Sequence, residues 1–348
     1  MRVELTIKDI ARLAGVSTAT VSRVINDYPG VREKTRIRVK KVIDKFGYQR
    51  NILARKLVTK KTSIIGVVLS DITNPFYSEI ARGIEDEARK WGYTVIFGST
   101  DNTREIQKEY VNLFREQRVD GIIFASVALQ DPDVEKLFKE DVPFVLVNRK
   151  LDTIKTDFVV LDNVKGAYMA AEHLIKLGHK RIGFICGPLN YSTGVDRLRG
   201  YKEALRKYNI EEYPELVKSG NFRQESGYRA FKEFMSMKSP PTAVFASNDF
   251  MALGVLEAAL ELGIRIPEDI ALVGFDDINF ASFKFVSLTT VAQRKYEMGA
   301  KGIQLLIKKI ESSERWIPQE IYLKPRLIIR GSCGYKLSGK KRKKGGVR

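Results

Sequence analysis

The chain has 348 residues and a formal net charge of +18, and this charge is unevenly distributed along it. Residues 1–61 contain 16 Lys and Arg against 5 Asp and Glu, and residues 332–348 contain 7 Lys and Arg and no acidic residue. The 270 residues between these segments carry 37 charges of each sign. A basic head on a neutral body indicates that one part of the protein contacts a polyanion.

Several classes of protein and site are disfavoured by what the sequence lacks. The N-terminus has no apolar signal-peptide core and the chain has no run of about 18 apolar residues, so we expect a cytoplasmic protein without a membrane span. Cys186 and Cys333 are too few to form a disulfide framework. His173 and His179 lie six residues apart, on different faces of a predicted helix, so we expect no metal and no cofactor.

The first 48 residues predict a helix-turn-helix. Thr6 is a candidate N-cap for a first helix that ends at Gly15, and Ser17 is a candidate N-cap for a second helix from Thr18 to about Asn26. A third amphipathic helix is predicted over 34–46. In such a motif the second helix enters the major groove of DNA with its N-terminal residues leading.

Residues 62–331 alternate apolar runs with amphipathic segments, which predicts a doubly wound α/β fold with parallel sheets. The predicted strands are 63–70, 93–99, 121–125, 144–148, 181–186, 243–246 and 270–275, and the predicted helices are 75–90, 104–117, 166–177, 197–208, 226–237 and 249–262. Ligands bind at the carboxyl ends of such strands. The segments to inspect are therefore 71–76, 148–149, 191–193, 248–249 and 276–277.

The head resembles the headpiece of the lactose-repressor/galactose-repressor family of transcriptional regulators. The resemblance is carried by Thr-Ile-Lys-Asp-Ile-Ala at 6–11, Ala-Gly-Val-Ser at 14–17, Thr-Val-Ser-Arg-Val-Ile-Asn at 20–26 and Lys-Thr-Arg at 34–36. It implies that Thr18, Ala19 and Arg23 read bases, and an arginine can donate two hydrogen bonds to guanine. Small polar residues around the helix ends suit phosphate or base contacts: Thr6, Ser17, Thr20, Ser22 and Asn26.

Residues 49–61 resemble the hinge helix of the same family, which lies in the minor groove of the operator. Leu57 occupies the position of the family's wedge residue, and an apolar wedge kinks DNA by unstacking a base step. Arg50 stands where the family often has proline, so a helix-starting restraint is lost and a charge is gained. The remaining DNA-binding candidates of this segment are Asn51, Ala54 and Arg55.

The body resembles the family's effector domain, which is similar to two-lobed periplasmic sugar-binding proteins. The matching motifs include Asn-Pro-Phe-Tyr at 74–77, Arg-Leu-Arg-Gly-Tyr at 197–201, Ser-Asn-Asp at 247–249 and Gly-Phe-Asp-Asp at 274–277. The resemblance implies an N-lobe of about 62–161 plus 291–323, a C-lobe of about 162–290 plus 324–331, and a basic, disordered tail of 332–348. The effector-binding candidates are Phe76, Arg149, Tyr191, Arg197, Phe222, Asn248, Asp276 and Gln293.

These observations predict a transcriptional regulator, in the expected form of a repressor, that binds pseudopalindromic operator DNA as a homodimer. Its expected effector is a sugar or a sugar derivative. The alternative is a regulator of the same family controlled mainly by a protein partner or by a non-sugar ligand. A secreted sugar-binding protein would need a signal sequence and no basic head. The sequence contains no phosphate-binding glycine motif that would indicate an enzyme. Asp276 and Asp277 are not expected to act as a catalytic carboxylate pair, because adjacent residues at a strand end point to opposite sides.

Overall fold

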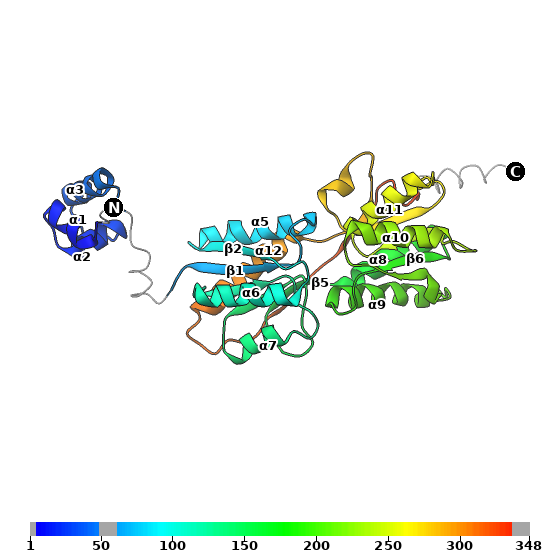
Figure 1. Cartoon of the computed structure of the whole chain (residues 1–348), viewed down its shortest axis with the longest axis horizontal. Helices are drawn as coiled ribbons and strands as arrows, with labels where there is room; N and C mark the ends of the chain where they lie inside the picture. The colour runs from blue at the N-terminus through cyan, green and yellow to red at the C-terminus, as the bar shows by residue number, and fades with distance from the viewer. Residues whose placement is uncertain (1–4, 49–60, 336–348) are drawn as a thin grey trace. The chain divides into compact units, whose positions relative to one another are not determined.

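The computed structural model describes residues 5–48 and 61–335, which form two compact units divided between Thr62 and Ser63 (Figure 1). We refer to them as the head unit and the α/β unit. Five predicted DNA contacts lie outside the described residues: Arg50, Asn51, Ala54, Arg55 and Leu57. The part of the predicted tail from residue 336 onward also lies outside them.

The head unit is built from three helices around a small apolar core. They are α1 (Ile7–Ala14), α2 (Thr18–Ile25) and α3 (Glu33–Phe46). As predicted, Thr6 caps α1, Ser17 caps α2, and Gly15 ends α1 in a left-handed conformation with φ of 60°. The core consists of small and β-branched side chains that recur at helical spacing: Ile10, Ala11, Ala14, Val21, Val24 and Val39.

The N-lobe of the α/β unit is a six-stranded, fully parallel sheet in the order β11-β5-β4-β3-β1-β2. Its strands are β1 (Ile64–Leu69), β2 (Thr94–Ser99), β3 (Gly121–Phe124), β4 (Phe144–Val147), β5 (Phe158–Leu161) and β11 (Glu320–Leu323). Its helices are α5 (Pro75–Lys90), α6 (Arg104–Glu116), α7 (Pro132–Lys139) and α12 (Lys295–Glu311). β3 and β4 are buried throughout, as expected for parallel strands covered on both faces.

The C-lobe repeats this plan in the order β12-β10-β9-β8-β6-β7. Its strands are β6 (Ile182–Cys186), β7 (Val217–Ser219), β8 (Ala243–Ala246), β9 (Ala271–Asp276), β10 (Thr289–Ala292) and β12 (Arg326–Ile328). Its helices are α8 (Asn163–Lys176), α9 (Ser192–Lys207), α10 (Gln224–Met235) and α11 (Asp249–Glu261), with short 3-10 turns η1 (Pro214–Leu216) and η2 (Asn279–Ser282). Only the edge strand β12 is antiparallel to its neighbour in this described sheet.

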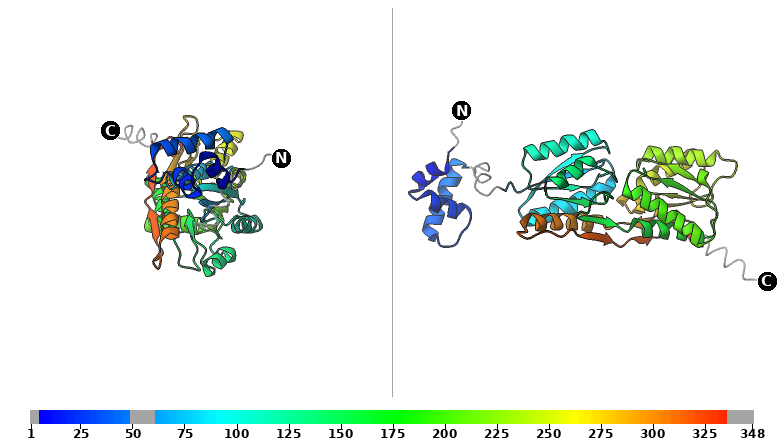
Figure 2. Two further views of the ribbon diagram at one scale, coloured as in Figure 1. Left: turned by 90° about the vertical axis from the view of Figure 1, so that its left-hand side faces the viewer. Right: turned by 90° about the horizontal axis from the view of Figure 1, so that it is seen from below.

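The chain passes between the lobes three times, after β5, after β10 and after β11. The segment that contains β11 and β12 runs along both lobes (Figure 2). The two-lobed, doubly wound α/β fold with an all-helical N-terminal unit is thereby confirmed. The second crossing was expected near Thr290. It lies after Ala292, because β10 continues to that residue and pairs with β9 up to Asp276.

Three predicted helices of the C-lobe begin earlier than expected. α8 begins at Asn163 instead of Gly166, α10 at Gln224 instead of Ser226, and α9 at Ser192 instead of Arg197. The first turn of α9 is Ser-Thr-Gly-Val, whose residues are weak helix formers, so apolar periodicity does not reveal it. Gly194 occupies this turn because a Cβ there would collide with the Pro188 carbonyl.

The tail was predicted to begin at residue 332, but the first residues of this segment are packed against the C-lobe. Ser332 and Cys333 are buried, and the Ser332 hydroxyl donates to the Leu272 carbonyl at 2.7 Å and accepts from the Thr289 amide at 2.8 Å. These bonds tie the segment after β12 to the C-lobe sheet, so the ordered domain extends beyond residue 331. Throughout the described ranges, no helix has the length and apolarity needed to cross a membrane.

Candidate functional site

The exposed face of α2 carries the predicted base-reading residues. Thr18, Ala19 and Arg23 are all exposed, while Val21 and Val24 of the same helix are buried in the head core. The arginine lies one turn after Ala19 and therefore on the same face of the helix. In the described part of the chain, the Arg23 side chain makes no ion pair and remains available for an external acceptor.

The small polar residues around α1 and α2 form the caps of these helices. The Thr6 hydroxyl donates to Asp9 at 2.6 Å and accepts from the Asp9 amide, which completes a capping box. The Ser17 hydroxyl lies 2.9 Å from the Thr20 hydroxyl and accepts from the Thr20 amide. The Asn26 amide group donates to the Ser22 carbonyl at 2.8 Å. These residues therefore fix the helix ends. Any contact that they make with DNA would use side-chain groups that already take part in these hydrogen bonds.

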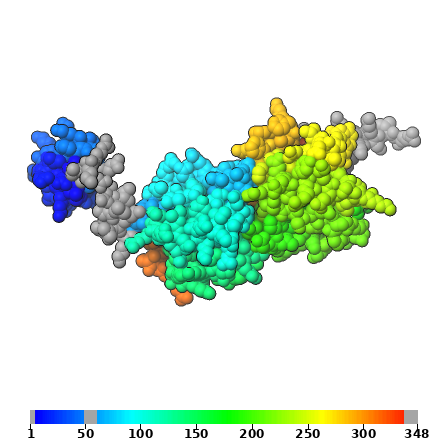
Figure 3. Space-filling view, in the orientation of Figure 1, coloured from blue at the N-terminus to red at the C-terminus, as the bar shows by residue number. Residues whose placement is uncertain are grey.

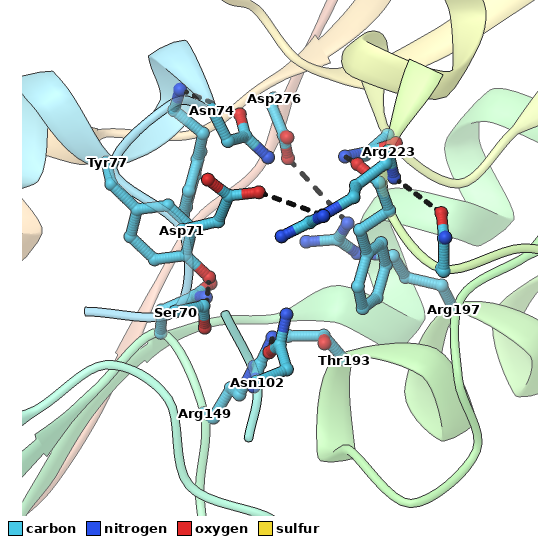
Figure 4. A pocket seen from close by; sticks show the side chains of 15 residues that line it. Ser70, Asp71, Asn74, Tyr77, Asn102, Arg149, Thr193, Arg197, Arg223 and Asp276 are labelled. Carbon is cyan, nitrogen blue, oxygen red and sulfur yellow. Dashed lines mark hydrogen bonds and ion pairs between the residues drawn. The ribbon is translucent and has the colours of Figure 1, made fainter. Parts of the chain in front are cut away.

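A polar cleft lies between the two lobes, where the carboxyl ends of their strands face each other. Its cavity volume is about 30 Å³, enough for only a few water molecules, so the two lobes lie closely together around the polar side chains that line it. The N-lobe contributes Ser70, Asp71, Asn74, Phe76, Tyr77, Asn102, Asn148 and Arg149 (Figure 4). The C-lobe contributes Thr193, Arg197, Asn221, Phe222, Arg223, Asn248 and Asp276.

Arg197 and Asp276 form the floor of the cleft on the C-lobe side. The Arg197 guanidinium donates to Asn163 at 2.9 Å and to the Ser247 carbonyl at 2.6 Å, and its Nη1 lies 3.7 Å from Asp276 Oδ1 (Figure 4). It also stacks over the Phe275 ring at 3.9 Å. Both charged side chains are almost fully buried, so this donor–acceptor pair is fixed in place for a ligand.

Burial raises the pKa of the Asp276 carboxyl to about 6, although Arg197 and a hydrogen bond from Gln293 act in the opposite direction. The Gln293 amide donates to Asp276 Oδ1 at 2.7 Å, and Lys295 donates to the Asp276 carbonyl at 2.9 Å. The backbone of Asp276 has a φ of 119°, a conformation that residues other than glycine rarely adopt. Such strain is typical of functional sites held by their surroundings.

Arg149 lies on the N-lobe side of the cleft, directly after β4. Its guanidinium donates to the Ser126 carbonyl at 3.1 Å and to the Asn102 side-chain oxygen at 3.0 Å. The ring of Tyr191, from the C-lobe, lies 3.7 Å from the centre of this guanidinium. This stacking joins the two lobes and holds the plane of the arginine in a fixed orientation.

Arg223 lies at the mouth of the cleft and bridges the lobes. It follows β7 in the C-lobe, and its Nε lies 3.1 Å from Asp71 Oδ2, while its Nη2 lies 3.2 Å from Asp101 Oδ1. Both aspartates belong to the N-lobe, where they follow β1 and β2. The Arg223 side chain is 42% exposed, so solvent screens these ion pairs in part.

Six of the eight predicted effector residues line the cleft, namely Phe76, Arg149, Arg197, Phe222, Asn248 and Asp276. Tyr191 and Gln293 do not line it. They lie behind the lining residues, where Tyr191 stacks on Arg149 and Gln293 bonds to Asp276.

Neither the effector-binding candidates nor the segments chosen for inspection included five of the lining residues, Ser70, Tyr77, Asn102, Asn221 and Arg223. Asn102 follows a predicted strand, so the rule that ligands bind at strand ends could have found it. Asn221 and Arg223 follow β7, a strand of three residues that has no apolar run.

The cleft combines paired hydrogen-bond donors and acceptors with three aromatic side chains, Phe76, Tyr77 and Phe222. Asn248 caps α11 and donates to the Phe222 carbonyl at 3.0 Å, which fixes the amide group at the cleft wall. Arg, Asn and Asp side chains suit neighbouring hydroxyl groups, while aromatic rings suit the apolar face of a sugar.

The carboxylate of Asp277, the residue after Asp276, is directed away from the cleft, because it accepts a hydrogen bond from Arg330 at 2.7 Å. Among the residues that the structure describes, no His, Cys, Asp and Glu side chains are grouped as metal ligands.

Comparison with known proteins places both units in one family. Residues 6–51 match the model of bacterial regulatory proteins of the lacI family, and residues 171–333 match a periplasmic binding protein-like domain. The chain is 37% identical over 328 residues to catabolite control protein A of Priestia megaterium, covering 92% of this chain and 98% of that protein.

Solved structures give the same result. A complex of the transcriptional regulator CelR with cellobiose matches with a TM-score of 0.72 and 33% identity, over 94% of this chain and 99% of that chain. The lac repressor dimer bound to operator and the anti-inducer ONPF matches with a TM-score of 0.84 and 29% identity, over 94% and 98% of the two chains. On the evidence of its helix-turn-helix, its two-lobed cleft and these similarities, the chain belongs to the lacI family of bacterial regulatory proteins.

Proposed function

We propose that this protein is a cytoplasmic transcriptional repressor that binds operator DNA with its head unit and is controlled by a carbohydrate in the interlobe cleft. The observation that carries the proposal is the combination of an exposed α2 face, with Thr18, Ala19 and Arg23, and a polar cleft built around Arg197 and Asp276. The first suits base edges in a major groove, and the second suits a polyol.

The basic head supplies affinity for DNA. Its phosphate contacts release counterions, so binding falls steeply as salt rises. Arg23 is the residue of α2 that can bond to guanine in two places, and Ala19 and the Thr18 methyl suit a thymine methyl group. The predicted hinge, residues 49–61, completes the proposed DNA-binding surface and bends the operator through Leu57.

The cleft supplies control, because the ligand contacts both lobes. Phe76 belongs to the N-lobe, whereas Phe222, Asn248 and Asp276 belong to the C-lobe. A ligand that bridges them stabilises one arrangement of the lobes over another, and this difference in affinity is what shifts an equilibrium between two states. The cellobiose complex of the similar CelR supports a carbohydrate as the ligand class.

The active form is a homodimer that associates through its α/β units and places two head units on a pseudopalindrome. An exposed aromatic cluster supports such an association. Phe280, Phe283 and Phe285 lie in or after η2, with ring centroids 5.4 and 5.7 Å apart in successive pairs. This segment projects from the surface of the C-lobe (orange, Figure 3), and exposed apolar patches of this kind mark interaction sites.

A second candidate keeps the DNA-binding function and replaces the sugar with a protein partner. The chain's similarity to a catabolite control protein is compatible with a different input, but the buried, paired groups of the cleft favour a small ligand.

The test has two parts. DNA selected from a random duplex pool is titrated with the protein at several salt concentrations, and the protein is titrated with sugars by calorimetry. Selection of one pseudopalindrome and binding of a sugar support the proposal. Salt-independent binding to all duplexes contradicts the DNA part. A complete lack of carbohydrate binding contradicts the effector part.

A further inference from the structure

The three arginines that line the cleft differ in their charge partners. Arg197 lies near Asp276, and Arg223 pairs with both Asp71 and Asp101. Arg149 pairs with no carboxylate among the described residues, since its two hydrogen bonds go to the Ser126 carbonyl and to the neutral Asn102 side chain. The cleft therefore contains one cation whose charge the neighbouring side chains leave uncompensated.

The environment of Arg149 makes this arrangement costly in the absence of a ligand. The residue is only 2% exposed, and its Nε is buried without a hydrogen-bond acceptor in the described structure. Burying an unpaired charge, or a polar group without a partner, is unfavourable for folding. A buried guanidinium with unused donors is suited to an anion that enters with the ligand, because an oxyanion accepts two of its hydrogen bonds.

The other side chains near Arg149 do not remove this charge. Arg149 and Arg197 line the same cleft. Burial lowers the pKa of Arg197, and the positive charge of Arg149 contributes in the same direction. The two carboxylates that line the cleft are already engaged, Asp71 by Arg223 and Asp276 by Gln293. A neutral sugar would occupy Arg197 and Asp276 and leave Arg149 without an anion.

We propose that the effector of this protein is an anionic carbohydrate, whose carboxylate or phosphate group pairs with Arg149 while its hydroxyl groups bind Arg197 and Asp276. The inference rests on the proposed function, since it assigns the charge of the ligand in the same cleft. Arg149 is a specificity-determining residue in this arrangement. Tyr191, stacked at 3.7 Å, keeps the guanidinium plane fixed, and the Nε–H group, which has no acceptor among the described residues, is the donor available to the anion.

Matched ligand pairs test the proposal on the wild-type, full-length protein. Calorimetry compares glucose with glucuronate and glucose 6-phosphate, galactose with galacturonate and galactose 6-phosphate, and ribose with ribose 5-phosphate. We expect an anionic member to bind about tenfold or more tightly than its neutral parent, because charge-assisted hydrogen bonds are about twice as strong as neutral ones. Whether the carboxylate or the phosphate binds more tightly identifies the anion.

Two variants assign the preference to a residue. Arg149→Gln removes the charge and keeps an amide donor, so the ratio of anionic to neutral affinity should fall to about one, while Arg149→Lys should retain part of it. Arg223→Gln tests the mouth of the cleft separately. Arg265→Gln is the matched control, because Arg265 pairs with Asp269 and does not line the cleft. The ratio should persist in this control.

Three results would overturn the proposal. Neutral sugars that bind as tightly as their anionic counterparts would contradict an anionic effector and leave the proposed function intact. A preference that is lost in Arg223→Gln and retained in Arg149→Gln would assign the anion to the mouth of the cleft. If no carbohydrate of either kind binds, the proposed effector class itself fails together with the inference. The wild-type pairs decide the outcome even if a variant fails to fold.

Discussion

Arg223 of the C-lobe and Asp71 of the N-lobe form an ion pair of 3.1 Å across the mouth of the cleft (Figure 4). The same guanidinium reaches Asp101 of the N-lobe at 3.2 Å. Both ion pairs exist only while the lobes are close together. They therefore stabilise the closed arrangement relative to any arrangement in which the lobes separate.

Arg223→Gln should weaken this closure. Partly exposed ion pairs contribute roughly 0.2–1 kcal/mol each, so the loss of both pairs should lower the affinity for the effector by about two- to thirtyfold. The radius of gyration of the unliganded protein, measured by small-angle scattering, should increase. Arg265→Gln is the matched control, because Arg265 pairs with Asp269 within the C-lobe. If both variants behave alike, the bridge across the mouth does not control closure.

Arg23→Ala should cost roughly 1–3 kcal/mol of operator binding and relax the preference for one guanine. The reason is that Arg23 is exposed on α2 beside Ala19 and has no described ion-pair partner. Fluorescence anisotropy with the selected operator and with random duplexes measures the effect. Arg38→Ala, an exposed arginine on α3, should affect both duplexes equally. An equal loss on random DNA for Arg23→Ala would remove this residue from base readout.

Ile10→Ala should destabilise the head unit and leave the stability of the α/β unit unchanged. Ile10 is fully buried in a core of only six buried residues, and such truncations cost about 2–5 kcal/mol. Calorimetric melting should show a lowered transition for the head, with the main transition unchanged. Leu13→Ala, at a position on the same helix that is 46% exposed, should have little effect. A shift of both transitions would show that the units do not melt independently.

Effector binding should weaken as the pH falls through about 6. Burial raises the pKa of Asp276 from 3.8 to about 6. Between these two pH values the carboxyl group is therefore protonated in the folded protein and ionised in the unfolded protein. The ionised group therefore lowers the free energy of unfolding as the pH rises through this window. A ligand hydroxyl that donates to the carboxylate favours the ionised form, so affinity should decrease by up to about tenfold per pH unit below 6.

Calorimetry from pH 5 to 8 measures this dependence, with a neutral sugar or a carboxylate sugar that does not titrate in that range. Asp276→Asn should bind more weakly and show a flat profile. A wild-type affinity that does not change between pH 5 and 7 would mean that the Asp276 carboxylate does not accept a bond from the ligand.

The sequence predicted the parts of the fold that are determined locally. The helix-turn-helix depends on caps and on short-range periodicity, so Thr6, Gly15 and Ser17 were identified correctly. The seven predicted strands are all present, but the buried apolar strand β5, the strands β10 and β11, and the helices α7 and α12 were not predicted although their own sequences favour them. By contrast, β7 and β12 have three residues each and exist because they pair with a neighbouring strand. Their pairing is a tertiary effect that local propensity does not contain.

The same distinction applies to the cleft. Strand ends and family motifs predicted Arg197 and Asp276 because their positions follow from the fold. The bridge made by Arg223 depends on how closely the lobes approach, and the place of Tyr191 behind Arg149 depends on contacts between the lobes. Neither relation has a local signal in the sequence. The DNA contacts proposed for Arg50 to Leu57 stay predictions, as these residues lie outside the described structure.

The central claim is that occupation of the cleft controls the affinity of the head for DNA. Its most direct test is the operator affinity, measured by fluorescence anisotropy with and without a saturating effector, for the wild type, Asp276→Asn and Asp277→Asn. Asp277 is the matched control, since its carboxylate pairs with Arg330 outside the cleft. We predict that the effector changes operator affinity about tenfold in the wild type and in Asp277→Asn, within the usual range of allosteric coupling, and leaves Asp276→Asn unchanged at the same concentration. A folded Asp276→Asn protein that responds like the wild type at wild-type effector concentrations would contradict the account.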